Sequence, residues 1–167
     1  MAKILIKNPG PVEFGGTPYG NVQVRPFVLQ TSDKGVPVGA NPVKVIEPGD
    51  TVALGALRAG MHLHTAIIIV SDPLGALSGR LGFAYADGKD DSVELAQREG
   101  RPHVPQDPDY FFTAQSLAAA IRKETESTKA PVTLPKDAVL LWTNTSGTTA
   151  EAGRMDVLVY GEDRGAL

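Results

Sequence analysis

Alternating apolar and polar residues predict that most of this chain is β-strand. The alternation is clearest in Thr51–Leu57 (TVALGAL), 79–86 (GRLGFAYA) and 155–160 (MDVLVY). Successive side chains of a strand point to opposite faces, so each segment presents one apolar face to a core. A strand is also predicted over 21–30 (NVQVRPFVLQ), where Pro26 cannot donate a ladder hydrogen bond and therefore indicates an edge or a bulge.

Further strands are predicted where short apolar runs stand between turn residues. The run 61–70 (MHLHTAIIIV) is the most apolar, and its IIIV end has apolar residues on both faces. It is therefore predicted to be a central strand buried on both sides. A short strand is predicted over 43–47 (VKVIE). The strands 138–143 (AVLLWT) and 155–160 are joined by a Gly-, Ser- and Thr-rich connection, which predicts an antiparallel hairpin.

One segment carries the pattern of a helix. Asp107 can cap a helix start, and Pro108 suits the first helical position. Apolar residues then recur at spacings of 4, 3 and 4, at Tyr110, Ala114, Leu117 and Ile121. This spacing predicts a helix over 109–123, although the second half, 117–124 (LAAAIRKE), is also compatible with a return to strand.

The composition favours an all-β fold with many turns. There are 18 Gly and 13 Pro, together 31 of 167 residues, against an average usage of about 12%. Regularly spaced Gly and Pro between short apolar runs are typical of a β-sandwich or barrel. The length predicts one domain, over 21–163, with an extended N-terminal arm over 1–20 and a tail over 164–167. The arm is interpreted either as a mobile segment or as an edge strand followed by a surface loop.

Charge and residue usage exclude several classes of function. The formal charge is −3, from 16 Lys and Arg against 19 Asp and Glu, without a basic cluster, so no nucleic-acid partner is expected. The absence of Cys excludes disulfides, thiolate metal sites and cysteine nucleophiles. No apolar run approaches the ~18 residues of a membrane span, and the apolar stretch near the start is too short for a signal peptide. We therefore expect a protein made in a cytoplasm and not bound to membranes.

His62 and His64 form the one candidate metal site. Alternate residues of a strand share a face, so the two imidazoles could bind one ion, as in cupin-like barrels. The cupin pattern also needs an acidic ligand a few residues on and another His in a partner strand, and TAIII follows His64. The third histidine, His103, lies in a Pro-rich loop. A pair of surface histidines on a strand is the favoured interpretation, and no metal is predicted.

No other motif predicts a reaction. Ser78 lies in GALSG, which is not the G-x-S-x-G elbow, and Gly88-Lys89-Asp90 lacks the length and hydroxyl of a P-loop. An acidic cluster fails the EF-hand spacing and is interpreted as a solvated loop; it comprises Asp87, Asp90, Asp91 and Glu94. We predict no catalytic residue, no cofactor and no enzymatic activity. The loop 98–109, with three prolines, is a candidate for contacting another chain.

A long stretch of the sequence resembles small virion proteins of tailed bacteriophages. The stretch TVALGALRAGMHLHTAIIIVSDPLGALSGRLGFAYADGKDD carries an ALG strand, an L-R-A-G turn, a long apolar strand, an LGA step and a hairpin ending in Y-x-D-G. The similarity continues in DPDYFFTAQSLAAA, PVTLPKDAVLLWT and MDVLVYGED, and so covers 51–163. Residues 1–50 match this pattern poorly. The chain resembles the capsid decoration, or cement, proteins.

The resemblance implies both a fold and a partner. It implies a mainly β protein with one short helix, built as a jelly-roll-like antiparallel β-sandwich with an extended N-terminal arm. It implies binding to the outer surface of the major capsid protein shell, stabilisation of that shell, a location on the virion exterior, and a homo-oligomer, either a dimer or a trimer. The arm over 1–20 is predicted to contact the capsid by adding a strand to a neighbouring sheet.

Three other functions remain open at this point. A head-tail connector or tail component is close to the decoration hypothesis. A cupin-like enzyme or small-molecule binder would use His62 and His64 and would contain metal. A carbohydrate-binding sandwich would need Trp142 and the tyrosines on one exposed face.

Overall fold

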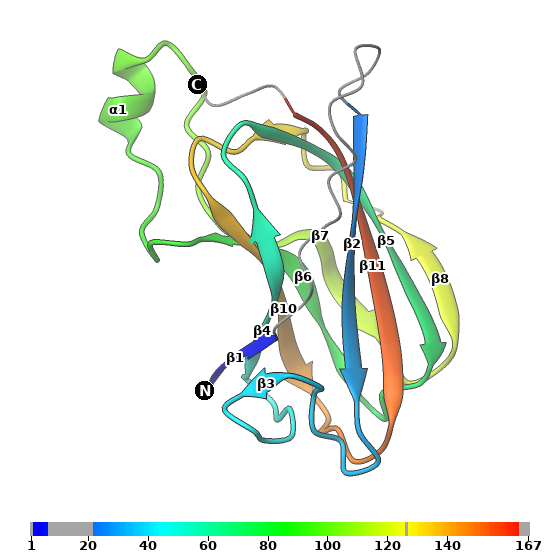
Figure 1. The fold of residues 1–167 in the computed structure, drawn as a ribbon. Coiled ribbons are helices and arrows are strands. Elements are labelled where there is room, and N and C mark those ends of the chain that lie inside the picture. The colour runs from blue at the N-terminus through cyan, green and yellow to red at the C-terminus, as the bar shows by residue number, and fades with distance from the viewer. Residues whose placement is uncertain (1, 7–21, 126, 164–167) are drawn as a thin grey trace.

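Two β-sheets face each other across an apolar core in the computed structural model, which describes residues 2–6, 22–125 and 127–163 (Figure 1). The six-stranded sheet has the order β3-β1-β4-β10-β6-β7, and the five-stranded sheet has the order β2-β11-β5-β8, with β9 also paired to β5. The first sheet comprises β3 (Ala40–Asn41), β1 (Lys3–Ile6), β4 (Thr51–Leu57), β10 (Ala138–Ser146), β6 (Ser78–Tyr85) and β7 (Asp107–Ser116). The second comprises β2 (Val22–Thr31), β11 (Gly153–Asp163), β5 (Met61–Asp72), β8 (Ile121–Glu124) and β9 (Val132–Thr133).

The order of the eight principal strands is that of a jelly roll. The strands β1, β3 and β9 are short, and the other eight can be counted from one to eight along the chain. Side by side, the strands of the first sheet are then the second, seventh, fourth and fifth, and those of the other sheet are the first, eighth, third and sixth. All pairs among these eight are antiparallel. Chain connections therefore cross repeatedly between the sheets, as in two interlocked Greek keys. The predicted jelly-roll-like β-sandwich is confirmed, and β1 adds one parallel pairing, to β4.

The core fills the space between the two sheets. Its largest fully buried side chains include Trp142, Tyr85, Phe83 and Phe111. Gly55 of β4 shows how closely the sheets approach, because a Cβ there would lie 2.7 Å from the ring of Phe27 on β2. Only glycine fits at that crossing.

Strand β5 is buried on one face, in contrast to the prediction of burial on both. Met61 and Leu63 point into the core, and after a bulge Ala66, Ile68 and Val70 do so. The bulge is at His64. Leu63 pairs with Gly161 and Thr65 pairs with Tyr160; Gly161 and Tyr160 are adjacent on β11, so His64 is one residue extra on β5. An inserted residue reverses which alternate side chains face inward. The outer residues Ile67 and Ile69 are half-buried.

The helix predicted over 109–123 is wrong. Residues 107–116 form β7, which pairs with β6, and Ile121–Glu124 form β8, so the alternative of a return to strand holds there. Irregular pairing of β7 buries Tyr110, Phe111 and Phe112 in succession, and this burial overrides the helical spacing. The short helix is instead α1 (Val93–Arg98), capped by Ser92, whose Oγ accepts the Leu95 N–H at 3.2 Å.

The predicted hairpin of 138–143 with 155–160 is also wrong. Both segments are strands, but β10 lies in one sheet and β11 in the other. The connection between them crosses the sandwich and passes Ile46, whose N–H donates to Thr149 Oγ1 at 2.9 Å and whose carbonyl accepts the Thr149 N–H at 3.1 Å. Residues 43–47 make these bonds with the connection and do not pair with a strand of either sheet, so the strand predicted over 43–47 is wrong.

Predictions for the chain ends and the sheet edges are confirmed in part. Pro26 lies on β2, an edge strand, as predicted from its missing donor. The first part of the predicted arm, Lys3–Ile6, is the strand β1, but it lies between β3 and β4 and so is not the predicted edge strand; residues 7–20 and the tail over 164–167 lie outside the described residues. Within the described part of the chain, no helix has the length and hydropathy needed to cross a membrane.

Candidate interaction surfaces

The bulge on β5 brings the two candidate histidines together on the outside of the five-stranded sheet. Their ring centroids are 4.8 Å apart in an edge-to-face arrangement. His62 Nδ1 lies 2.8 Å from Thr133 Oγ1, and His64 Nε2 lies 3.4 Å from Glu162 Oε1. The nitrogens are thus engaged with a hydroxyl and a carboxylate. Among the described residues, no group of three or more His, Asp or Glu side chains is arranged to hold a metal ion.

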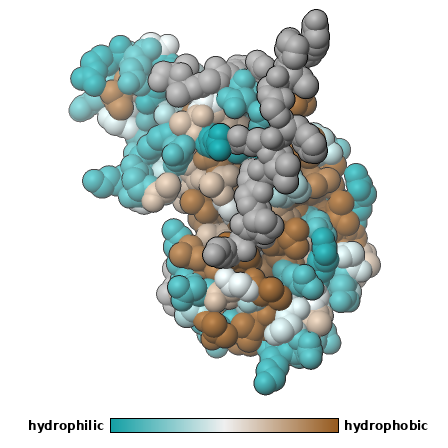
Figure 2. Space-filling model, viewed as in Figure 1, coloured by the Kyte–Doolittle hydropathy of each residue, from teal (hydrophilic) through white to brown (hydrophobic). Residues whose placement is uncertain are grey.

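Residues 86–106 form a lobe between β6 and β7, and this lobe carries α1 away from one end of the sandwich (Figure 1). It contains most of the predicted acidic cluster and of the Pro-rich loop. Its exposed apolar residue is Val93, half exposed at the start of α1. The rest of its surface is mostly hydrophilic (Figure 2).

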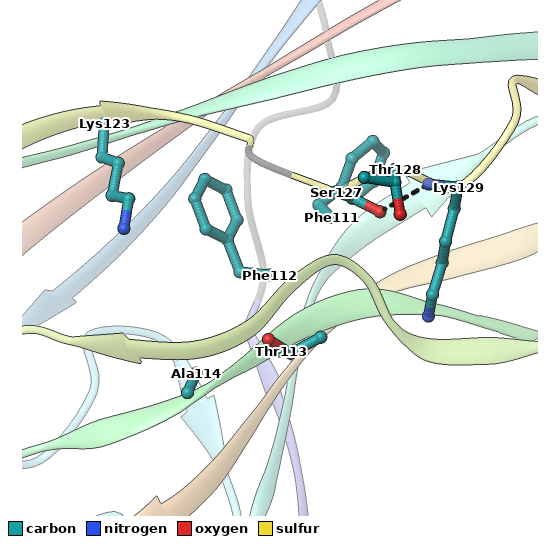
Figure 3. Close-up of a pocket in the computed structure, with 8 residues that line it drawn as sticks. All are labelled: Phe111, Phe112, Thr113, Ala114, Lys123, Ser127, Thr128 and Lys129. Atoms are coloured by element: carbon teal, nitrogen blue, oxygen red, sulfur yellow. Dashed lines mark hydrogen bonds between the residues drawn. The ribbon is translucent and has the colours of Figure 1, made fainter.

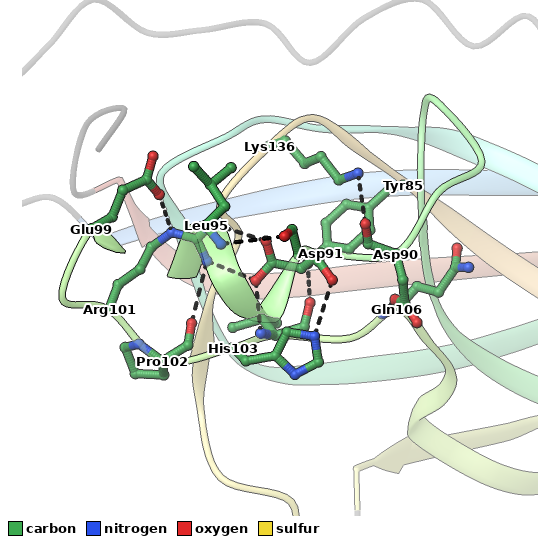
Figure 4. Close-up of polar contacts among 12 residues, drawn as sticks. Tyr85, Asp90, Asp91, Leu95, Glu99, Arg101, Pro102, His103, Gln106 and Lys136 are labelled. Atoms are coloured by element: carbon green, nitrogen blue, oxygen red, sulfur yellow. Dashed lines mark hydrogen bonds and ion pairs between the residues drawn. The ribbon is translucent and has the colours of Figure 1, made fainter. Parts of the chain in front are cut away.

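A buried ion pair holds this lobe together (Figure 4). Arg101 binds Asp91 through two bonds, Nη1 to Oδ2 at 2.7 Å and Nη2 to Oδ1 at 2.9 Å. Asp91 also accepts the buried Val104 N–H at 3.0 Å, and Tyr85 in the core donates its hydroxyl to the Val104 carbonyl at 2.5 Å. The Arg101 bonds, with Val104 and against the effect of burial, lower the pKa of Asp91 to about 2. The Pro-rich loop is therefore fixed to the sandwich.

The other carboxylates of the acidic cluster are used separately. Lys136 binds Asp87 at 2.8 Å and donates to the Lys89 carbonyl at 2.8 Å. The Gln106 N–H donates to Asp90 Oδ1 at 2.6 Å, which ties the two ends of the lobe together. Asp87, Asp90 and Glu94 are exposed, as predicted for a solvated loop, whereas Asp91 is buried, so the prediction is wrong for Asp91.

A second surface lies where β1 meets β3. It comprises Leu5, Val38 and Val43, and we call it the β1–β3 corner. Leu5 pairs with Asn41 of β3, and the two valines flank β3 in the chain. Their side chains are exposed by 50%, 56% and 80%, respectively. Figure 2 shows apolar residues gathered on the lower part of the molecule, where β3 and its loops lie in Figure 1.

Beside the corner, a buried carboxylate binds the start of the chain. Asp50 Oδ1 accepts the Ala2 N–H at 2.8 Å, and the Thr51 N–H donates to the Ala2 carbonyl at 3.0 Å. Asp50 Oδ2 accepts the Glu47 N–H at 3.0 Å and pairs with Lys44 at 2.6 Å. Burial alone would raise the pKa of Asp50, but the bonds from Lys44, Glu47 and Ala2 outweigh it and lower that pKa. The carboxylate therefore stays ionised where it fixes β1.

A shallow groove of about 300 Å³ lies between β7 on one side and Lys123 and residues 127–129 on the other (Figure 3). Its lining comprises Phe111, Phe112, Thr113, Ala114, Lys123, Ser127, Thr128 and Lys129. Lys129 at one end is bound to Asp107 and Asp109 at 2.7 and 2.6 Å. No carboxylate or imidazole is among the lining residues. Ser78 lies elsewhere, at the start of β6.

The whole fold is similar to chains in two solved phage capsids. One is in the capsid of Ralstonia phage GP4, with a TM-score of 0.60 and 14% identity over 98% of this chain and 99% of that chain. The other is in the capsid asymmetric unit of cyanophage Pam1, with a TM-score of 0.54 and 12% identity over 92% of this chain and 94% of that chain. The sequence matches no protein-family model and no curated protein. These similarities establish a common fold.

Sequence reasoning misses the two carboxylates that organise these surfaces. Charge patterning places Asp91 in a solvated acidic loop, and Asp50 belongs to none of the motifs that the sequence shows. The Pro-rich loop is recognisable from its composition, but Arg101 within it carries no motif. Each carboxylate is defined by the groups that the fold brings to it, and spacing along the chain gives no sign of them.

Proposed function

We propose that this protein is a component of a bacteriophage capsid, and more specifically a decoration protein. The observation that carries the proposal is the end-to-end similarity in fold to a chain of a phage capsid, over 98% of one chain and 99% of the other. A match over nearly the full length of both chains supports a role in the same kind of assembly more strongly than a match to one part of the chain would. The sequence resemblance to decoration proteins over 51–163 supports the same assignment independently.

A decoration protein needs stable contacts and no reaction. It attaches to the outer surface of the major capsid protein shell and raises the cost of separating neighbouring subunits. The sandwich offers a rigid body, and two surfaces extend from it, the lobe and the β1–β3 corner. Even a modest contact becomes strong when many copies bind one shell and each is held by several sites.

The proposal is tested by adding the purified protein to capsids that lack it. We expect saturable binding in sedimentation, and electron microscopy should show density outside the shell at many equivalent positions. Density confined to the portal vertex or tail would support the connector alternative and contradict decoration. The absence of saturable binding would contradict a capsid-surface role altogether.

Two matched variants would locate the contact. Val93→Asp places a charge on the lobe, and Val43→Asp places one on the β1–β3 corner, both at exposed positions where folding should be unaffected. A contact through one surface predicts that only the corresponding variant loses capsid binding. Circular dichroism of both variants provides the folding control.

A further inference from the structure

The edge of β4 is a complete binding site for one extended strand. It offers main-chain bonds in parallel register, with Lys3 opposite Thr51, Ile4 opposite Val52 and Leu5 opposite Ala53. It also offers a core position that encloses Ile4, which is fully buried. Backbone bonding gives affinity in such sites, and the pocket for alternate side chains gives specificity.

Asp50 and Thr51 complete this site by gripping the residue that precedes the strand. Together they bind both backbone polar groups of Ala2, the N–H at 2.8 Å and the carbonyl at 3.0 Å. Neither bond depends on how the strand is connected to the rest of its own chain. The site therefore recognises a short N-terminal segment with a backbone N–H, a side chain facing outward and then an isoleucine facing inward.

The strand that fills this site is joined to the rest of its chain by a long connection. Residues 7–21 separate β1 from β2, and fifteen residues can span at most about 50 Å. A domain of this length has a radius of gyration of about 15 Å. The connection is thus long enough for β1 to reach the β4 edge of an adjacent copy. Because β1 and β2, the next strand in the chain, lie in different sheets, no hairpin ties β1 to its own domain.

We propose that β1 is exchanged between neighbouring copies of this chain, so that each copy supplies Lys3–Ile6 to the β4 edge of the next. The contacts at β3, β4 and Asp50 are the same whether the strand comes from its own chain or from another. The relative concentration of the two strands then decides which one binds, and a strand tethered to its own domain by a linker has an effective concentration of about 1 mM there. Copies held side by side on a shell would meet that value; this last step rests on the proposed function.

The exchange can be measured by disulfide trapping, since the chain has no cysteine of its own. One preparation carries Lys3→Cys, and an isotopically heavy preparation carries Thr51→Cys; these positions are paired across β1 and β4 near the surface. The two are mixed at about 1 mM and, separately, after binding to capsids. Mass spectrometry counts disulfide-linked dimers of one light and one heavy chain. Arg122→Cys on β8, at the far edge of the other sheet, replaces Thr51→Cys in the control mixture.

Exchange predicts roughly ten-fold more mixed dimer with Thr51→Cys than with Arg122→Cys. Adding Ile4→Ala to the Lys3→Cys chain should abolish this excess, because Ile4 is buried. In the mixture without capsids, adding Leu5→Ala should preserve the excess, because Leu5 is exposed. The double variant Lys3→Cys/Thr51→Cys reports strands that remain in their own chain. The inference is wrong if, both at about 1 mM and on capsids, the double variant forms disulfides only within single chains and the mixture with Thr51→Cys gives no more mixed dimer than the mixture with Arg122→Cys. Sedimentation with capsids still tests the proposed function in that case.

Discussion

Two buried aspartates each hold an extension of the sandwich, and they do so in different ways. Asp91 holds the lobe through a bidentate pair with Arg101, ten positions further along the same loop. Asp50 holds β1 largely through backbone bonds, one of them to Ala2, 48 positions away. The first partner is a unique side chain of the same segment. The second is a peptide group that any copy of the N-terminus can present.

The difference separates a permanent structure from an exchangeable one. A planar guanidinium bound through two bonds in a buried place is costly to release, because the charge left behind has no water. A terminal strand can leave with its own backbone groups exposed to water, and an identical strand can replace it. The lobe is thus suited to be a fixed contact surface, and β1 a connection between copies.

The largest expected effect comes from Asp91→Ala. It leaves the Arg101 guanidinium, 10% exposed, without its main partner and the Val104 N–H without an acceptor. The opening free energy of the lobe should fall by about 3 kcal/mol or more, measured by hydrogen exchange at the Ala96 amide, which donates to the Ser92 carbonyl and keeps this acceptor in the variant. Glu99→Ala, which removes the exposed second partner of Arg101, is the matched control and should change little. Equal effects of the two changes would contradict this account.

A smaller effect is expected from Ile4→Ala, which empties a core position beside β4. The free energy of unfolding in urea should fall by about 2–3 kcal/mol. Leu5→Ala, one residue further and half exposed, should stay within about 0.5 kcal/mol of the parent. If Leu5→Ala were as costly as Ile4→Ala, β1 would not bind through the face described.

The smallest effect is expected from acid. The folded-state pKa values of Asp91, about 2, and of Asp50 lie below the values of the unfolded chain. Stability from these carboxylates is therefore complete above the unfolded pKa and is lost as the pH falls through the folded one. For Asp91 the loss between about pH 4 and 2 should be about 2 kcal/mol, measured by urea unfolding. In the Asp91→Asn variant the free energy of unfolding should lack this part of its dependence on pH. An unchanged pH dependence would contradict the role given to Asp91.

Much of the fold could be predicted from the sequence because the burial of a strand face requires apolar residues at alternate positions of that strand. The alternation in Thr51–Leu57 recurs as β4 with the predicted bounds, and 155–160 lies within β11. The missing donor of Pro26 correctly indicated an edge strand. In each case the residue reports on its own position, and no distant partner has to be known.

Two of the errors share one cause, which is pairing with residues far away in the chain. Residues 107–116 carry helical spacing, yet the edge of β6 makes them a strand. Strands β10 and β11 follow each other with a turn-rich connection, yet they pair with β4 and β6 in one sheet and with β2 and β5 in the other. The helix α1 was missed because its six residues are too few to show a period.

The sequence by itself determined the β class and most strand positions, because these depend on each residue's own preference for water or core. The tertiary structure alone decided the jelly-roll order, the bulge at His64 that brings the histidines together, and the placing of Arg101 on Asp91 and of Ala2 on Asp50. Those features require groups that are distant in the chain to meet within hydrogen-bond distance. These contacts are fixed by the way the two sheets pack, and the pattern of residues along the chain does not specify that packing.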